Sequence, residues 1–260
     1  MIHHDDGVRL REFWNRRYTD FRLSESGWLG AGERLNQLIY RCKQQAWRRA
    51  IVSSGLSRRA AWSVLDAGCG QGHFARLFRA EYPRAAYVGL DISERLVQHL
   101  QRDLPEVEFH LADICTWNDP GGRRFDLIQS FEVLHLILDD DTVTRAMANL
   151  ASQLSDQGSM LVTAALPEAT FQPGDYLRFR SRAFWREMLA SLGLRIVRDA
   201  QIYYWLPAGG PTQKHLRYAM TRLGPDALYA IDRTAFHLRL PQPASLGIDC
   251  GMHLLTICRT

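Results

Sequence analysis

Several residue types that mark common functions are scarce in this chain of 260 residues. Lysine occurs only as Lys43 and Lys214, so nearly all basic residues are arginine, and the net charge is +4. No basic run interleaved with aromatics is present, which argues against nucleic-acid binding. The five cysteines are an odd number without a Cys-x-x-Cys pair. Neither a disulfide framework nor a zinc site is therefore predicted.

Long apolar segments are also missing. No run reaches the roughly 18 apolar residues of a membrane span, and the first residues lack the apolar centre of a signal peptide. With reduced thiols, these absences lead us to expect a cytoplasmic protein that is a monomer or a homodimer. The hydrophobic fraction is 46% and the charged fraction 23%, which predicts a folded chain with a sizeable core.

The most informative stretch is a glycine turn between a short apolar strand and an amphipathic helix. Gly68, Gly70 and Gly72 stand at alternate positions, and Asp66 precedes them. Glycine tolerates positive φ and lets another molecule approach the backbone closely. A dinucleotide fingerprint, Gly-x-Gly-x-x-Gly, would need its third glycine where His73 stands. This spacing weighs against a nicotinamide oxidoreductase, although it does not remove that alternative.

Acids follow two further predicted strands. Asp91 ends the strand predicted over 85–91 and follows Gly68 by 23 residues (from 68 to 91). That distance is close to the roughly 20 residues at which a carboxylate binds ribose hydroxyls. Asp113 follows the strand predicted over 106–112, and a fourth strand is predicted over 125–130. Carboxyl ends of parallel strands meet at one sheet edge, so these acids are expected around one ligand site.

The pattern Asp-x-Gly-x-Gly-x-Gly resembles motif I of class I S-adenosylmethionine-dependent methyltransferases. The strand ends that follow it resemble the later motifs of that family, in the same order. The resemblance covers roughly residues 60–165. It implies an enzyme that binds S-adenosylmethionine, releases S-adenosylhomocysteine and needs no metal. The residues implied to bind this cofactor are Asp66, Gly68, Gly70, Gly72, Asp91, Ile92, Asp113, Ile114 and Ser130.

The predicted N-terminal helix resembles the Trp-x-x-x-Tyr segment that covers the cofactor in many small-molecule methyltransferases. Trp14 and Tyr18 have this spacing, and an aromatic face attracts a sulfonium as it attracts other cations. We include both among the candidate cofactor residues. Packing in an apolar helix face is the alternative explanation. Four aromatic residues are candidates for the acceptor pocket: Trp28, Tyr40, Tyr203 and Trp205.

Methyl transfer requires a base only when the acceptor arrives protonated. The candidates are His135, just beyond the fourth strand, and Glu132 in the same loop. The loop lacks the Asn-Pro-Pro-Tyr type of signature used on nucleic-acid bases. A small-molecule acceptor is therefore expected, methylated at oxygen or nitrogen and placed in secondary metabolism. A glycan or lipid-linked precursor is an alternative, and so is a non-catalytic cofactor-binding regulator.

Strands and helices alternate along the chain, which predicts an α/β fold with right-handed crossovers. By resemblance, we expect a Rossmann-like, seven-stranded, mostly parallel sheet with helices on both faces and an antiparallel last strand. Residues 1–55 are predicted to form a helical cap and 56–260 the methyltransferase domain, with a helical insertion over about 206–246. Residues 21–32 and 167–180 are predicted to be loops. The acids at 139–141 are assigned to a helix N-terminus, where carboxylates suit the dipole.

Overall fold

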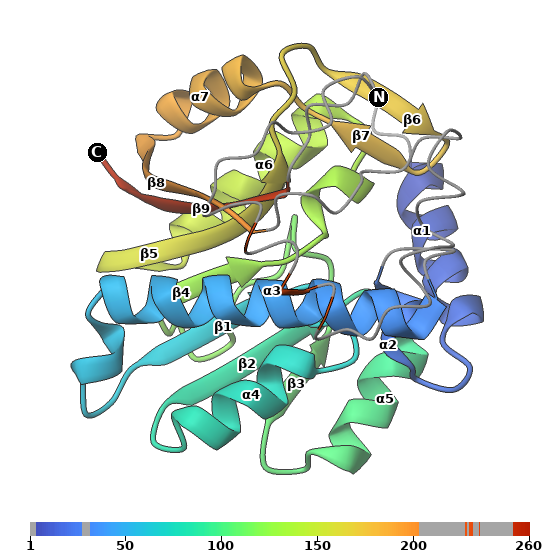
Figure 1. Ribbon diagram of the computed structural model, residues 1–260, viewed down its shortest axis with the longest axis vertical. Helices are drawn as coiled ribbons and strands as arrows, with labels where there is room; N and C mark the ends of the chain where they lie inside the picture. Colours follow the sequence, from blue (N-terminus) through green and yellow to red (C-terminus); the bar gives the residue numbers. More distant parts are fainter. Residues whose placement is uncertain (1–3, 28–31, 203–226, 228, 231–233, 235–251) are drawn as a thin grey trace.

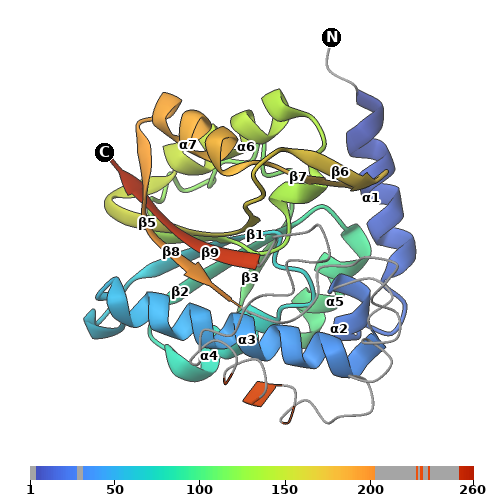
Figure 2. The same ribbon diagram turned by 45° about the horizontal axis from the view of Figure 1, so that its top comes forward.

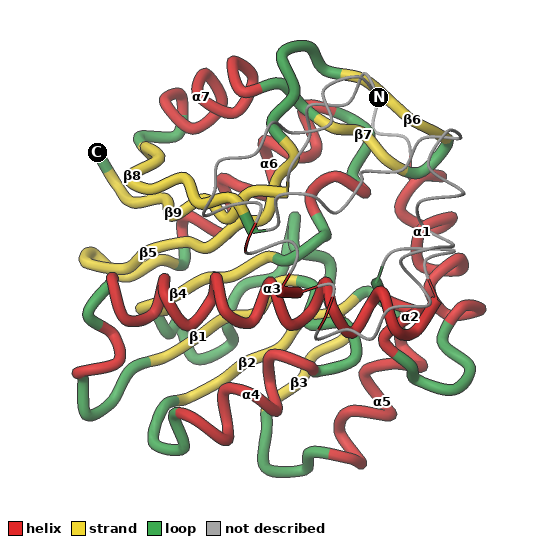
Figure 3. Tube along the Cα trace, viewed as in Figure 1, coloured by secondary structure: helices red, strands yellow, loops and turns green. Residues whose placement is uncertain are grey.

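A seven-stranded sheet runs through the centre of the molecule (Figures 1 and 3). The structure is a computed structural model that describes residues 4–27, 32–202, 227, 229, 230, 234 and 252–260. The strand order is β3-β2-β1-β4-β5-β9-β8. The strands are β1 (Ser63–Ala67), β2 (Ala86–Asp91), β3 (Glu108–Leu111), β4 (Phe125–Ser130), β5 (Leu154–Ala165), β8 (Leu194–Gln201) and β9 (Met252–Arg259).

The first five strands pair in parallel, and β9 is antiparallel to both β5 and β8. The predicted fold class, with its antiparallel last strand, is therefore confirmed. Chain order reverses beside β1, because β2 lies on one side of it and β4 on the other. Ligands of open α/β sheets bind at such a switch point, outside the carboxyl ends of the strands.

Helices cover both faces of the sheet (Figure 2). One face carries α3 (Gly32–Ser53), α4 (His73–Glu81) and α5 (Glu94–Asp103). The other face carries α6 (Asp140–Ser152) and α7 (Arg182–Ser191). Residue alternation in β1 produces the two layers, since Val64 joins the first apolar cluster and Leu65 the second. Side chains of Ser93, Asp139 and Ser181 accept bonds from the first-turn amides of α5, α6 and α7.

The N-terminal helices stand at the carboxyl edge of the parallel strands. Helix α1 (His4–Arg17) lies beside that edge, and the short α2 (Leu23–Ser26) follows it (Figure 1). The loop prediction over 21–32 was therefore wrong for α2. Helix α3 buries Leu38 and Trp47 in the same cluster as α4. The division at residue 55 stays a prediction, and most of the predicted insertion lies outside the described residues.

The predicted loop over 167–180 is also corrected, because it contains an antiparallel hairpin. Its strands are β6 (Phe171–Gly174) and β7 (Leu177–Phe179). The rings of Phe171 and Phe179 pack across the hairpin with centroids 5.5 Å apart. Two short 3₁₀ helices, η1 (Leu56–Arg58) and η2 (Leu134–Leu136), complete the described elements. No helix in the described part of the chain is long and apolar enough to cross a membrane.

Candidate active site

A cavity of about 1020 Å³ opens at the carboxyl edge of the sheet, between the glycine turn, α1 and the loop after β4. Most residues proposed for the site line it. They are Trp14, Tyr18, Tyr40, Asp66, Gly68, Gly70, Asp91, Ile92, Asp113, Ile114 and Glu132. Three proposed residues, Gly72, Ser130 and His135, are not in the lining. Another three, Trp28, Tyr203 and Trp205, lie outside the described residues.

Gly68 brings the glycine turn against the loop after β4. Its φ is +86°, and a Cβ added there would lie 2.2 Å from Cγ2 of Val133. Its amide donates to the carbonyl of Leu90 at 2.9 Å, which joins the turn to β2. Gly72, at φ +69°, is the N-cap of α4 instead of a lining residue. The positive φ values explain why glycine occupies these positions.

Asp91 organises the cavity wall from the end of β2. Its carboxylate accepts from the amide of Gly70 at 3.1 Å and from that of Ser93 at 2.9 Å. Burial raises its pKa to about 6. Asp113, after β3, accepts from the amide of Cys115 at 2.8 Å. Two fixed carboxylates thus line adjacent parts of the cavity, where hydroxyl and amino groups of a ligand would find acceptors.

Asp66 lies deeper, beneath the glycine turn. It is almost fully buried, and the hydroxyl of Tyr87 donates to its carboxylate. Burial raises the pKa of Asp66 to about 7. The carboxyl group therefore titrates near neutral pH, far from the pKa of about 3.9 of an exposed aspartate.

Replacing Asp66 by asparagine tests this burial. A carboxyl with a raised folded-state pKa binds a proton on folding, so the free energy of unfolding falls as pH rises from about 4 to about 7. We expect Asp66→Asn to remove the contribution of Asp66 to that fall, while Asp91, whose pKa burial raises to about 6, keeps its own contribution. The ligand-free variant should exceed wild type by up to about 4 kcal/mol near pH 8. Thermal unfolding across this range measures the effect, and equal pH dependence of the two proteins would contradict it.

Aromatic residues of α1, together with Tyr18 directly after it, form the cavity wall on the N-terminal side. Trp14 stacks on Tyr18, with ring centroids 5.7 Å apart, and Tyr18 is only 3% exposed. Asn15 anchors the helix, since its side-chain oxygen accepts from the Ser93 hydroxyl at 2.8 Å. Phe13 also packs on Tyr176 of the β6–β7 turn. Both aromatic residues predicted from the Trp-x-x-x-Tyr spacing therefore face the same cavity as the glycine turn.

The opposite wall holds three titratable groups. Glu132 lines the cavity, and its Oε1 lies 3.1 Å from Nζ of Lys43. Its Oε2 lies 3.6 Å from Nε2 of His135. Burial lowers the pKa of His135. Burial alone would raise the pKa of Glu132, but the charge of Lys43, the largest opposing cause, leaves it lowered. Glu132 is therefore an ionised carboxylate, with the cation of Lys43 beside it in the lining. The neutral imidazole of His135 lies outside the lining.

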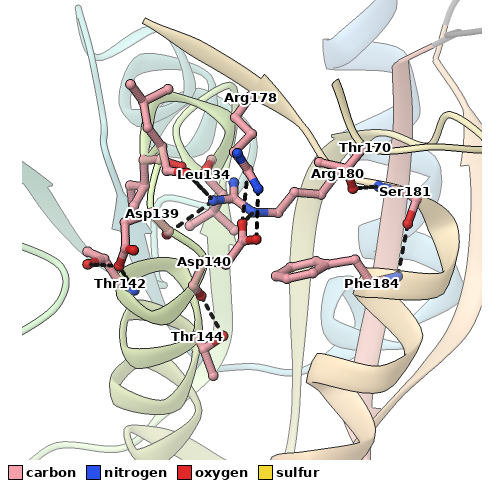
Figure 4. Close-up of polar contacts among 12 residues, drawn as sticks. Leu134, Asp139, Asp140, Thr142, Thr144, Thr170, Arg178, Arg180, Ser181 and Phe184 are labelled. Carbon is pink, nitrogen blue, oxygen red and sulfur yellow. Dashed lines mark hydrogen bonds and ion pairs between the residues drawn. The ribbon is translucent and has the colours of Figure 1, made fainter. Parts of the chain in front are cut away.

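The loop that carries Glu132 and His135 is held by a buried arginine from the end of β7 (Figure 4). Arg180 donates to the Asp140 carboxylate at 2.8 Å. Its other N–H groups reach the carbonyls of Leu134, Ile137, Leu138 and Asp139. Arg178 also donates to Asp140, at 2.9 and 3.1 Å. The hairpin thereby fixes the loop after β4, although the two are distant in sequence.

Lys43 and His73 are among the lining residues that the sequence did not single out. A signal for Lys43 was present, because it interrupts the apolar row of Leu35, Ile39 and Trp47 at i+4 spacing on α3. His73 follows the N-cap of α4, and burial lowers its pKa to about 4. It is therefore a neutral wall residue packed against the ring of Tyr40.

Comparison with known proteins agrees with this geometry. Residues 64–158 match the family model described as a methyltransferase domain. A trans-aconitate 2-methyltransferase of Methylobacterium nodulans is 44% identical over 154 residues, which are 57% of each chain. One from Klebsiella pneumoniae is 34% identical over 99 residues, 38% of this chain and 37% of that protein. The chain thus covers about a third to three-fifths of these relatives' lengths.

Among solved structures, a similar one is magnesium protoporphyrin IX methyltransferase from Synechocystis with bound S-adenosylmethionine. Its TM-score is 0.62 at 16% identity, and the alignment covers 100% of both chains. At that identity the likeness concerns the fold. The sheet order, the glycine turn and the matched methyltransferase domain therefore agree with one another.

Proposed function

Because the chain belongs to the class I S-adenosylmethionine-dependent methyltransferases, we propose that it transfers a methyl group from S-adenosylmethionine to a small-molecule acceptor. The observation that carries the proposal is the position of Asp91. Its fixed carboxylate lines a cavity of about 1020 Å³ together with Gly68 and Gly70. A carboxylate there suits ribose hydroxyls, and the open glycine backbone suits close approach of a ligand.

The lining residues fit this cofactor chemically. Asp91 would accept from its ribose hydroxyls and Asp113 from its adenine amino group. Trp14 offers an aromatic ring that attracts a cationic sulfonium, and Tyr18 packs against that ring. When bound, S-adenosylmethionine supplies an activated methyl group. The protein's own task is then to hold the acceptor in line with that group at about 3 Å.

For the proton of a hydroxyl or amine acceptor, Glu132 has the better position. Its carboxylate lines the cavity, whereas His135 lies outside the lining, with its Nε2 3.6 Å from Glu132. We therefore assign the base to Glu132 and the support of its charge to Lys43, with His135 beside it as a neutral imidazole. Transfer to the acceptor's oxygen or nitrogen is part of the proposal. Its place in secondary metabolism, the glycan or lipid-linked alternative and the cytoplasmic location stay predictions.

Calorimetric titration tests the cofactor first. S-adenosylmethionine and S-adenosylhomocysteine should bind to the intact chain with about micromolar affinity, and NAD should not. Asp91→Ala should weaken binding by at least about tenfold, since a hydrogen bond to a charged group contributes roughly 1.5–3 kcal/mol. Asp113→Asn is the milder comparison, because the amide keeps an acceptor oxygen. Binding of NAD alone, or of none of the three, would reject the proposal.

A further inference from the structure

The acceptor side of the cavity is built around one strained residue. Glu132 has a φ of +62°, the left-handed region that side chains other than glycine seldom adopt. Its amide donates to the Thr163 hydroxyl at 2.7 Å, and Thr163 is buried in β5. Such strain persists only where the surroundings impose it, and it gathers at functional sites. The backbone therefore directs this carboxylate into the cavity wall.

The charge next to Glu132 is already balanced. Lys43 is 2% exposed and lies 3.1 Å from the carboxylate. No other lysine or arginine among the described residues forms an ion pair with Glu132. His135, the remaining titratable neighbour, is neutral at pH 7 because burial lowers its pKa. The pair leaves little positive charge to attract an anionic acceptor.

The rest of the described lining also offers little free positive charge. Eight of its residues are Asp or Glu, whereas the basic ones are Arg16, Lys43 and Arg145. Arg16 pairs with Glu12, and Arg145 donates to the Thr142 hydroxyl at the end of α6 where Asp139 and Asp141 lie. Arg145 forms no ion pair among the described residues, so at most one guanidinium of the described lining is left for the several carboxylates of such an acceptor. Trans-aconitate, the substrate in the relatives' names, is a tricarboxylate.

We propose that Glu132 and Lys43 select an acceptor that presents a hydroxyl or amine hydrogen and exclude carboxylate acceptors such as trans-aconitate. This inference rests on the proposed methyltransferase function. In the transfer, the acceptor's lone pair forms the new bond to the methyl carbon. The electron pair of the broken carbon–sulfur bond stays on sulfur. The proton of the acceptor passes to the Glu132 carboxylate. A carboxylate acceptor has no proton to give and is repelled by Glu132.

Two probes with opposite charge test the selection by calorimetry on the full chain saturated with S-adenosylhomocysteine. Glu132→Gln keeps the shape of the side chain but leaves the Lys43 charge unbalanced. It should bind trans-aconitate at least tenfold more tightly than wild type does. Tyramine, which carries a phenol and an ammonium, should bind wild type more tightly than it binds Glu132→Gln. Lys43→Met should bind trans-aconitate no better than wild type, because it removes the cation.

The outcomes separate this inference from the proposed function. Tighter binding of trans-aconitate to wild type than to Glu132→Gln would overturn the acceptor class, and so would equal binding to the two proteins. Methyl transfer to trans-aconitate by the wild-type protein would overturn it directly. Absence of S-adenosylhomocysteine binding to wild type, measured in the saturating titration, would instead reject the proposed function. Thermal unfolding of each variant shows that it is folded before the probes are compared.

Discussion

Replacing Arg180 by leucine will lower the free energy of unfolding by about 3 kcal/mol, the lower end of the cost of removing one partner of a buried ion pair. The Arg180 side chain is 1% exposed. The substitution leaves Asp140 without this partner and removes a donor from four backbone carbonyls of the loop after β4. Asp140 is part-exposed and keeps Arg178, which limits the loss. Thermal unfolding should show a drop of roughly 6–12 °C.

Arg178→Gln is the matched control for Arg180→Leu. Arg178 pairs with the same carboxylate, but its side chain is 31% exposed, and among the described residues it donates to Asp140 alone. Exposed ion pairs contribute about 0–1 kcal/mol. The control should therefore unfold close to wild type. Equal losses in the two variants would show that Arg180 acts as an ordinary surface charge and not as the clamp of the loop.

The cofactor side of the cavity was predictable because its signals are local. Gly68, Gly70 and Asp91 each stand at the end of a strand that a short apolar run already indicates. The sheet then brings strand ends together without further information. Trp14 and Tyr18 were proposed from the resemblance to a Trp-x-x-x-Tyr segment, which is also a local pattern, and their spacing of four places both on one helix face.

The acceptor side depends on contacts between distant segments. Lys43 meets Glu132 across 89 residues (from 43 to 132), and only the packing of α3 on the sheet makes the pair. His135 was the first candidate for the base, yet it lies in η2 and outside the cavity lining. Glu132, whose φ is positive, has its side chain in the lining instead. No local sequence pattern predicts the 3₁₀ helix η2 or the positive φ of Glu132.

The hairpin of β6 and β7 shows a third case. Its segment has the proline, glycine and aspartate content of a loop, and its strands have only four and three residues. Partners elsewhere stabilise it, because Arg178 and Arg180 reach Asp140 at the start of α6. A segment whose order comes from remote charges cannot be assigned from its own sequence.

Among alanine substitutions in the glycine turn, Gly68→Ala should cause the largest loss of stability and of cofactor binding. The new Cβ would lie 2.2 Å from Cγ2 of Val133, and the φ of +86° is unfavourable for alanine. Overpacking costs about 1–3 kcal/mol and backbone strain a similar amount. We expect a loss of about 3 kcal/mol in the free energy of unfolding and at least about tenfold weaker binding of S-adenosylhomocysteine.

Gly70→Ala and a second substitution separate the two causes. A Cβ on Gly70 meets nothing nearer than Ser26 Cβ at 3.7 Å, so in the ligand-free protein only its φ of +51° adds strain. That variant should lose about 1 kcal/mol of stability. Adding Val133→Ala to Gly68→Ala removes both methyl groups that the new Cβ approaches, while the backbone strain remains. It should recover about half of the loss. No recovery would mean that φ, and not the contact with Val133, requires glycine at position 68.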